Sequence, residues 1–571
     1  MKPSEFVNLK YRPKESDLIC LFRIEPNRVS IKDAAANVAL ESSVGTWTEV
    51  KSEKEYVRKL AAKVFSIKGN MVKIAYPNEL FEKGNAPNIL SSIAGNIFGM
   101  KIVKNLRLED IKIPKEILNS FSGPKYGIEG IRKMVNIKNR PLLGTIIKPK
   151  LGLVTKDHAY VAYDAWRGGC DIVKDDENLS SQKFNEFEER LARTLESANL
   201  AEEATGEKKA YLVNVTAETK EMMKRAQLVE DLGGKFVMID VVTEGFGALQ
   251  TLREADFKLA IHAHRAMHAA FTRNKKHGIS MMVLADLCRL IGMDTLHIGT
   301  IVGKMEGDEE EVEEIEEEIE KKLVKETKDR LAQNWNKIKP TLAVSSGGLH
   351  PGHVPFLIKS LGKDLVIQMG GGIHGHPRGT LRGAIAARQA IEATMQKKSL
   401  KEYSKKQQNE EVIRNFLKPD YIVMHTSLPG SPFMIIQKEN PSKNDLKETA
   451  IFTAAFSKQW KNGGKNVDID IFKGSQIYKT KGMKTGTFGV KGDKETIKVK
   501  PELVLIIQKG KIRAVPSNGK EKILANIKPG KLNKERAAEK IAKIIRDKFH
   551  LPVHKEEVMQ AIPSDKIDVK N

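Results

Sequence analysis

The strand–helix rhythm between residues 140 and 400 constrains the fold of this sequence more than any other feature. Eight short apolar runs of β type recur there, and each is followed by a segment of helix length. The runs span residues 142–150, 170–177, 210–216, 236–242, 258–264, 295–304, 342–348 and 365–372. Eight consecutive strand–helix units predict a closed parallel (β/α)8 barrel, the TIM-barrel architecture.

Reactive side chains recur at or just after the C-terminal ends of these runs. That end of a parallel barrel carries the active site in enzymes of this architecture. The residues concerned are Lys148, Lys174, His264, His297 and the turn Ser346-Gly347-Gly348. A structural protein has no reason to place such groups at equivalent strand ends, so the pattern indicates an enzyme.

One of these ends, in the segment GGCDIVKDDENLSSQ (168–182), places a lysine beside three carboxylates. Side chains alternate along a strand, so Lys174 and Asp176 face the same way, and Glu177 can turn inward where the strand ends. Two carboxylates and one further oxygen would hold a hard cation such as Mg²⁺. A free ammonium would repel that ion, so Lys174 makes sense as a ligand only as a CO₂ carbamate. Taken alone, the segment also fits a surface Lys–Asp pair.

The segments flanking the barrel have different patterns. Residues 1–120 mix short strands and helices, including a strand at 18–26 and a helix at 30–43 with Ser30 as N-cap. Beyond residue 400 the sequence predicts short strands, a helix at 446–460 and a final helix at 535–549. The predicted fold class is therefore α/β. It comprises an N-terminal α+β domain (1–120), a catalytic barrel (121–400) and an additional C-terminal α+β domain (401–571).

An acidic run at residues 306–320 is predicted to be a solvated helix of the barrel, not a metal cluster. Val312, Ile315, Ile319 and Leu323 follow one another at helical spacing and form one apolar stripe.

The charge is unevenly distributed. The net charge is +23, and residues 401–571 hold 35 Lys and Arg against 20 Asp and Glu. Such a basic segment can indicate a nucleic acid partner. A lysine-rich surface of a thermally stable or halotolerant protein explains the charge equally well.

The three cysteines are widely spaced, which fits a reducing cytoplasm. No apolar run reaches membrane-spanning length, so no membrane association is expected.

The motifs resemble the large subunit of ribulose-1,5-bisphosphate carboxylase/oxygenase (RuBisCO). They lie at residues 148–153, 168–182, 262–271, 297–307, 345–353 and 368–379, and segments 6–26, 41–50 and 92–110 resemble its N-terminal domain. The segment HGHPRG is typical of the archaeal form III proteins. RuBisCO-like proteins that do not carboxylate lack several of the residues present here. Ile146 departs from plant-type relatives, which have threonine there, and a polar contact near the site is lost.

The resemblance implies roles for the reactive residues. Lys174 would be the carbamylated lysine that binds Mg²⁺ together with Asp176 and Glu177, and CO₂ would be the activator. Lys148 would be the base that forms the enediol, and His264 would assist hydration and proton transfer. Lys304 would close over bound substrate.

The resemblance also implies binding residues. Lys150 would hold the substrate, Arg265 and His297 would bind one phosphate, and Ser346, Gly347 and Gly348 would bind through a hydroxyl and N–H groups. Gly370 and Gly371, preceded by Gln368, would approach the second phosphate. Glu41, Thr46, Trp47 and Asn96 would come from a partner subunit, so a homodimer or a higher oligomer of dimers is expected. His262 and His268 could be functional or structural.

The activity implied is carboxylation of ribulose 1,5-bisphosphate with CO₂ and water to two 3-phosphoglycerates, with O₂ as a competing substrate. By resemblance to form III, the pathway would be archaeal AMP or nucleoside salvage.

The C-terminal segment resembles the NFACT RNA-binding domain in residues 409–411, His425, 429–433, Ser457-Lys458, and Lys479 with the strand 485–490. Lysines 473, 479, 481, 484 and 491 could contact phosphates of RNA or of the ribosome. Two alternatives stay open at this point. The segment could be an idle basic appendage, or the chain could be an RNA-binding protein whose barrel is only a scaffold.

Overall fold

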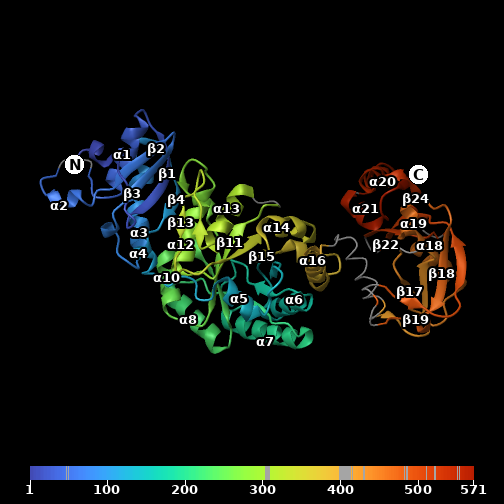
Figure 1. Ribbon diagram of the computed structural model, residues 1–571. Coiled ribbons are helices and arrows are strands. Elements are labelled where there is room, and N and C mark those ends of the chain that lie inside the picture. Colours follow the sequence, from blue (N-terminus) through green and yellow to red (C-terminus); the bar gives the residue numbers. More distant parts are fainter. Residues whose placement is uncertain are drawn as a thin grey trace. The chain divides into compact units, whose positions relative to one another are not determined.

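The computed structural model describes residues 1–571 except 47, 49, 303–308, 398–412, 414–415, 429–430, 481–482, 484–486, 509–510, 518, 520–521, 550, 552, 554 and 571. The chain forms two compact units, residues 1–398 and 399–571, and each is described by itself (Figure 1). Some residues with predicted roles lie outside the described residues, namely Trp47, Lys304, 409–411, 429–430, Lys481, Lys484 and 485–486.

The N-terminal part of the first unit is a five-stranded sheet. Its order is β10 (Gly278–Ile279), β4 (Val103–Lys112), β1 (Leu18–Pro26), β3 (Met71–Tyr76) and β2 (Lys63–Lys68). The predicted strand at 18–26 is confirmed as β1. The predicted helix is α1 (Ile31–Glu41), where the Ser30 hydroxyl accepts the Asp33 N–H as N-cap. Strand β10 comes from the barrel segment and pairs parallel with β4, which joins the sheet to the barrel.

The eight predicted barrel strands all exist and close into one parallel barrel. In order around the barrel they are β5 (Leu142–Ile146), β6 (Ile172–Lys174), β7 (Ala210–Asn214), β8 (Phe236–Asp240), β9 (Ala260–His264), β11 (Thr295–Gly299), β14 (Leu342–Ser346) and β15 (Leu365–Gln368). All but β9 end earlier than predicted. After β5, for example, Pro149 has no N–H to donate to a ladder, so Lys148 lies in the loop beyond the strand.

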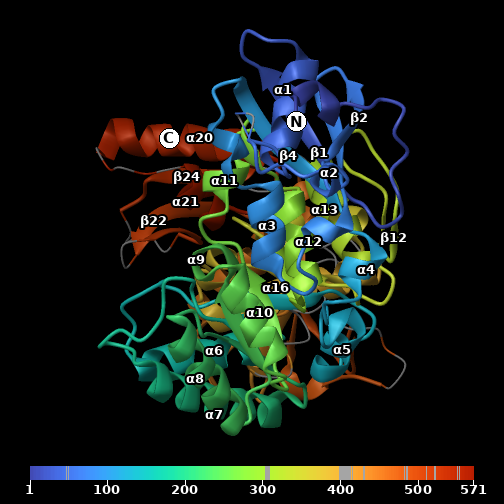
Figure 2. The same ribbon diagram turned by 90° about the vertical axis from the view of Figure 1, so that its left-hand side faces the viewer.

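Helices cover the outside of the barrel (Figure 2). They are α6 (Thr155–Arg167), α7 (Phe187–Thr205), α8 (Thr219–Asp231), α10 (Phe246–Glu254), α12 (Met281–Ile291), α13 (Glu309–Glu320), α14 (Val354–Leu361) and α16 (Thr380–Met395). Every residue of α12 is buried, because this helix packs between the barrel and β4 of the N-terminal sheet.

The N-terminal end of the barrel is closed by apolar packing. Ile128, Ile131 and Val135 of α5 (Gly127–Val135) pack there on strand residues such as Ile172 and Met238. The reactive strand ends therefore lie at the other end of a filled core.

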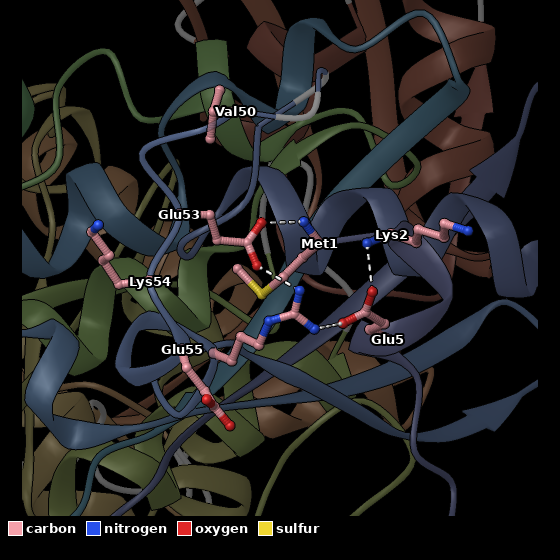
Figure 3. Close-up of a pocket in the computed structure, with 8 residues that line it drawn as sticks. Met1, Lys2, Glu5, Val50, Glu53, Lys54 and Glu55 are labelled. Carbon is pink, nitrogen blue, oxygen red and sulfur yellow. Dashed lines mark hydrogen bonds and ion pairs between the residues drawn. The ribbon is translucent and has the colours of Figure 1, made fainter.

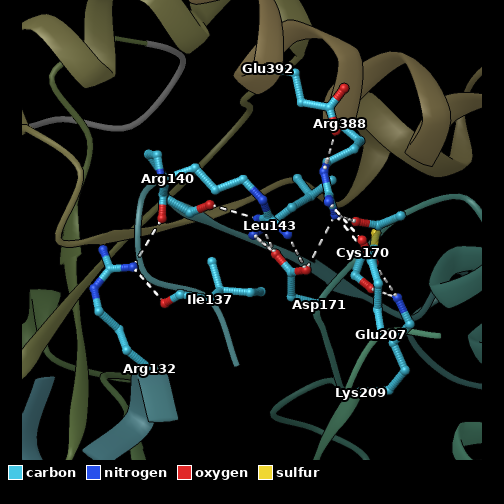
Figure 4. Close-up of polar contacts among 12 residues, drawn as sticks. Arg132, Ile137, Arg140, Leu143, Cys170, Asp171, Glu207, Lys209, Arg388 and Glu392 are labelled. Atoms are coloured by element: carbon cyan, nitrogen blue, oxygen red, sulfur yellow. Dashed lines mark hydrogen bonds and ion pairs between the residues drawn. The ribbon is translucent and has the colours of Figure 1, made fainter. Parts of the chain in front are cut away.

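An ion-pair network anchors the beginning of β6 at this closed end (Figure 4). Both guanidinium N–H₂ groups of Arg140 donate to Asp171, at 2.6 and 2.8 Å, and the Leu143 N–H donates to the same carboxylate at 2.8 Å. Arg388 lies 3.4 Å from Asp171 and also pairs with Glu207. Asp171 itself is fully buried, so its charge depends on these donors.

The acidic helix is partly as predicted. In α13 the side chains of Val312, Ile315 and Ile319 are buried on one stripe. The prediction for Leu323 is wrong: the helix ends at Glu320, and Leu323 lies in strand β12 (Leu323–Val324), 66% exposed. The helix is also less solvated than predicted, because Glu318 is buried and accepts the indole N–H of Trp335 at 2.8 Å.

The second unit has the predicted α+β character. One sheet has the order β17 (Met434–Ile436), β16 (Ile422–Thr426), β18 (Val467–Lys473) and β21 (Glu495–Val499), with α18 (Lys443–Ala455) packed on it. A second sheet, β23 (Lys511–Val515), β22 (Leu503–Gln508), β24 (Ala525–Leu532) and β25 (Ile567–Lys570), shares a core with α20 (Lys534–Phe549). The sequence reading missed this second sheet.

All three cysteines of the chain, Cys20, Cys170 and Cys288, are buried and unpaired. Burial raises the pKa of all three thiols, that of Cys288 to about 12. Among the described residues, no helix is long and apolar enough to cross a membrane.

Candidate active site

The end of β6 buries a lysine amine among carboxylates. Lys174 is 1% exposed. Its Nζ donates to the carbonyl of Asp175 at 2.7 Å and lies 3.1 Å from the sulfur of Met238. Burial lowers the pKa of Lys174, although the carboxylates of Glu177 and Asp176 act in the opposite direction. The lowered pKa increases the share of neutral amine, which is the form that reacts with CO₂.

Asp175 takes part in a different set of contacts, as strand alternation requires. Its carboxylate contacts the Tyr211 hydroxyl (2.7 Å), Arg190 Nε (3.1 Å), the Asn214 N–H (3.1 Å) and His158 Nε2 (3.2 Å). Burial alone would raise the pKa of Asp175, but Arg190 and the other donors outweigh it and hold the pKa well below its usual range. This network fixes the backbone between Lys174 and Asp176.

The two carboxylates that follow are held by cations from neighbouring loops. Lys148 Nζ lies 2.9 Å from Asp176 Oδ2, and Lys150 Nζ lies 3.8 Å from Glu177 Oε1. His264 Nε2 is 3.7 Å from Glu177 Oε2. Burial opposes ionisation of Asp176, but the hydrogen bonds from Lys148 and Asn178 and the charge of Lys148 together outweigh it and lower the pKa of Asp176. The predicted metal residues and the predicted base therefore lie together.

These residues fit a Mg²⁺ site under one condition. Among the described residues, no group of three His, Cys, Asp or Glu side chains is placed to hold a metal ion. Asp176 and Glu177 supply two oxygen ligands of the kind Mg²⁺ prefers. The third must come from the neighbouring Lys174, and that lysine offers an oxygen only as a carbamate.

A hydrogen-bonded chain of four side chains crosses three neighbouring strands, β9, β11 and β14. Thr295 Oγ1 lies 2.6 Å from His262 Nδ1, and His262 Nε2 lies 3.0 Å from His297 Nε2. His297 Nδ1 in turn lies 2.7 Å from Ser346 Oγ. Because two ring nitrogens face each other, one imidazole donates while the other accepts. His262 is therefore a support for His297, the residue predicted to bind phosphate.

The sequence reading missed the partner that orients His264. Asp240 Oδ1 lies 2.9 Å from His264 Nδ1. Asp240 is the last residue of β8, and its position at a strand end was the signal that could have found it. His268 is more distant from the chemistry: its Nδ1 lies 3.0 Å from the Thr272 hydroxyl, and burial lowers the pKa of His268 to about 4.

The predicted phosphate-binding residues line the remaining strand ends. Gly347 and Gly348 follow β14 with φ values of +124° and +70°, which favour glycine. A Cβ on Gly370 would lie 3.2 Å from Lys148 Cε, so this glycine leaves room for the lysine. Gln368 is buried at the end of β15, and Gly371 begins the short helix α15 (Gly371–His374).

Arg265 lies beside Gly299 at the end of β11. A Cβ on Gly299 would be 2.8 Å from an Arg265 nitrogen, and burial lowers the pKa of Arg265 to about 10.

Three of the residues predicted to act in a partner's site, Glu41, Thr46 and Asn96, lie in the described part of the N-terminal domain. Glu41 ends α1, Thr46 donates to the carbonyl of Thr48, and Asn96 begins a short 3-10 helix. Within the described part of the chain, no hydrogen bond or ion pair links Glu41, Thr46 or Asn96 to the barrel.

A pocket in the N-terminal domain is separate from this chemistry (Figure 3). It is lined by Met1, Lys2, Glu5, Val50, Glu53, Lys54, Glu55 and Arg58. Its central cation, Arg58, pairs with Glu5 at 2.9 Å and with Glu53 at 2.8 Å, so this pocket holds none of the reactive groups.

The fold and the site together define a (β/α)8-barrel enzyme with a buried lysine and two carboxylates at one strand end. Family models agree in detail. The ribulose bisphosphate carboxylase large chain N-terminal domain matches residues 5–117, and the catalytic domain of the same chain matches residues 127–415. The chain belongs to the RuBisCO large-chain family, and its enzymatic class is ribulose bisphosphate carboxylase.

Similar proteins are archaeal, as the resemblance to form III predicted. The ribulose bisphosphate carboxylase of Methanocaldococcus jannaschii is 52% identical over 410 residues, which cover 70% of this chain and 96% of the relative. That of Pyrococcus furiosus is 49% identical over 407 residues, covering 70% and 94%.

Solved structures of the same family agree. The dimeric archaeal RuBisCO from Hyperthermus butylicus has a TM-score of 0.67 at 47% identity and covers 70% of this chain and 96% of that one. The octameric enzyme from Pyrococcus horikoshii has a TM-score of 0.67 at 46% identity, covering 71% and 94%. Beyond the barrel, the NFACT protein RNA binding domain matches residues 404–492.

Proposed function

We propose that this chain carboxylates ribulose 1,5-bisphosphate with CO₂ and water to two 3-phosphoglycerates, with O₂ competing, through a site activated at Lys174. The observation that carries the proposal is the buried Lys174 amine with its lowered pKa beside Asp176 and Glu177. In activation the lone pair of Nζ forms a bond to the carbon of CO₂, and one N–H proton leaves to solvent. The product is an anionic carbamate with two oxygens.

The carbamate of Lys174, Asp176 and Glu177 would hold Mg²⁺. When bound, that ion would polarise the oxygens of the sugar bisphosphate and stabilise negative charge on them. Lys148 would take the C3 proton of the substrate once its ion pair with Asp176 is broken. His264 is oriented by Asp240 and would pass protons at its other nitrogen, Nε2, which faces Glu177.

The two phosphates would be bound at opposite sides of the barrel mouth. Arg265, His297 and the Ser346–Gly348 turn would bind one phosphate, and Lys150 would hold the sugar. The N–H groups of Gly370 and Gly371, preceded by Gln368, would bind the other. Lys304 keeps its expected role of closing over bound substrate, by resemblance alone.

We propose a homodimer, or an oligomer of dimers, as the active species. The similar solved enzymes are dimeric and octameric. Glu41, Thr46, Trp47 and Asn96 of one subunit would complete the site of the other. In agreement with this, no hydrogen bond or ion pair in the described part of the chain joins Glu41, Thr46 or Asn96 to their own barrel. We also propose a cytoplasmic location and a supply of substrate from AMP or nucleoside salvage, on the likeness to archaeal form III.

Radiolabelled-CO₂ fixation tests the site. The Lys174→Ala variant is expected to fix no CO₂ above background in the presence of ribulose bisphosphate and Mg²⁺. The matched control is Lys209→Ala, because the Lys209 side chain is also buried in this barrel but pairs with Glu207 away from the reactive end. Activity in Lys174→Ala, or equal loss in both variants, contradicts the carbamate site.

RNA binding by the second unit is a second candidate function. We propose domain limits of 1–120, 121–400 and 401–571. Two observations support an RNA or ribosome partner for the last domain: the NFACT RNA binding domain matches residues 404–492, and residues 401–571 are basic. The full-length chain is expected to bind RNA with an affinity that falls steeply with salt. Absence of any RNA-dependent change in fluorescence polarisation at low salt contradicts this function.

A further inference from the structure

The hairpin formed by β19 (Ile477–Tyr478) and β20 (Gly489–Val490) has two different faces. Ile477 pairs with Val490, and Tyr478 pairs with Gly489. Ile477 and Val490 pack against an apolar cluster that contains Phe433 and Phe472. Side chains alternate along a strand, so Tyr478 and Gly489 share the opposite face of the hairpin.

The Tyr478 ring on that face is both held and exposed. A Cβ built on Gly489 would lie 2.3 Å from the Cζ of Tyr478, so the ring lies directly over the glycine backbone. The residue is nevertheless 42% exposed, so part of the ring stays accessible to solvent. Any residue larger than glycine at position 489 would displace the ring. The pair therefore fixes a flat aromatic surface in place.

The segment that carries this ring is rich in lysine. In sequence, residues 473–500 contain eight lysines and two acidic residues, and of these lysines Lys494 and Lys498 pair with Asp470 and Asp468. Lys491 extends β20 by one residue, since its N–H donates to the Gln476 carbonyl at 2.9 Å, and alternation places it on the face of Tyr478. Its side chain is exposed, and no ion pair to an acidic residue involves it within the described part of the chain. Lys479 follows β19 directly, and its Nζ lies 4.7 Å from the centroid of the Phe488 ring.

We propose that this hairpin binds single-stranded RNA, with one base stacked on Tyr478 and the adjacent phosphates bound by Lys491 and Lys479. The inference rests on the proposed RNA-binding function and names where and how the contact is made. A lysine cluster complements a polyanion, and an immobilised exposed ring offers an unpaired base a stacking partner. In a duplex the base faces are occupied by neighbouring bases, so the ring selects for single strands.

Fluorescence polarisation with the full-length protein and a short fluorescein-labelled oligoadenylate tests the inference. Tyr478→Leu should weaken binding about 5- to 100-fold, since one base–aromatic stack is lost. Tyr478→Phe keeps the ring and should bind within about twofold of the parent. Tyr478→Trp should bind as well, and its indole fluorescence should be quenched by RNA. Lys491→Gln should lower the slope of log affinity against log salt by about one.

The outcomes separate this inference from the function on which it rests. If the parent protein binds no RNA, both fail together. If the parent binds RNA and Tyr478→Leu binds equally well, only the stacking contact is overturned. Competition by an RNA duplex as strong as that by the single strand also overturns it, and so does equal competition by polyglutamate. A circular dichroism spectrum of Tyr478→Leu that matches the parent shows that the fold is retained.

Discussion

Two buried aspartates at opposite ends of β6 provide a sharp test of how this barrel separates stability from chemistry. Asp171 and Asp175 are both 0% exposed, and each is paired with a buried or half-buried arginine. Asp171 lies at the closed end of the strand, whereas Asp175 lies between Lys174 and Asp176. Substitution of each by asparagine removes one buried negative charge and little volume.

The expected loss of stability is similar for the two variants. Asp175→Asn leaves Arg190, whose side chain is 0% exposed, without its counter-charge, and Asp171→Asn does the same to Arg140. Breaking one partner of a buried ion pair costs about 3–5 kcal/mol. Urea unfolding measures this as a lower midpoint, followed by the fluorescence of Trp166 and Trp335, which are buried in the first unit.

The expected loss of activity differs. Asp175→Asn releases the backbone that positions Lys174 and Asp176, and a misplacement of about 1 Å in a reacting group lowers rates on the order of 100-fold. CO₂ fixation and retention of labelled CO₂ on the protein should both fall. Asp171→Asn should keep both within about twofold, measured where it is folded, because the closed end of a barrel serves stability. If both variants keep their activity, or if both lose it equally, the proposed separation of a stabilising Asp171 from a site-positioning Asp175 is refuted.

Two further predictions concern an added methyl group at Gly370 and the protons held by three buried carboxyl groups. Gly370→Ala should lower carboxylation with little change in thermal stability, because the new Cβ would lie 3.2 Å from Lys148 Cε; steady-state kinetics beside a melting curve tests this. Burial raises the pKa of Asp110 to about 7, that of Glu318 to about 8 and that of Asp286 well above its usual range. In the folded state these three carboxyl groups hold protons that the unfolded chain releases above about pH 4, so their contribution to stability should fall as pH rises from about 4 to 8. Asp286→Asn removes one of them, so the free energy of unfolding of the parent minus that of the variant should fall over this range in calorimetry, and a difference that rises would contradict the assignment.

Much of the barrel and of its reactive end could be predicted because strand periodicity is local. The alternation that puts Lys174 and Asp176 on one side is set by the chain itself, and the structure places Asp176 beside Lys148. The strand–helix rhythm likewise predicted all eight strands. Predicted C-terminal ends lie beyond the observed ones where a proline or a loop begins.

Contacts between distant elements could not be predicted in this way. Asp240 orients His264, and Thr295 completes the histidine chain, only because neighbouring strands are in a particular register. Glu318 is buried because α13 packs on Trp335, whereas its sequence neighbourhood is almost entirely acidic. The second sheet of residues 503–570 was missed because the sequence reading continued from the strand at 495–499 directly to the final helix.

The placement of the cysteines gives this protein a built-in probe of partial opening. Cys20 lies in the N-terminal sheet, Cys170 just before β6 and Cys288 in α12, and the second unit has none. Each thiol is buried with a raised pKa, so a thiol reagent reacts only when its surroundings open. The rate of alkylation at each cysteine therefore measures the opening of one layer of the carboxylase unit, and it is blind to motion of the C-terminal unit.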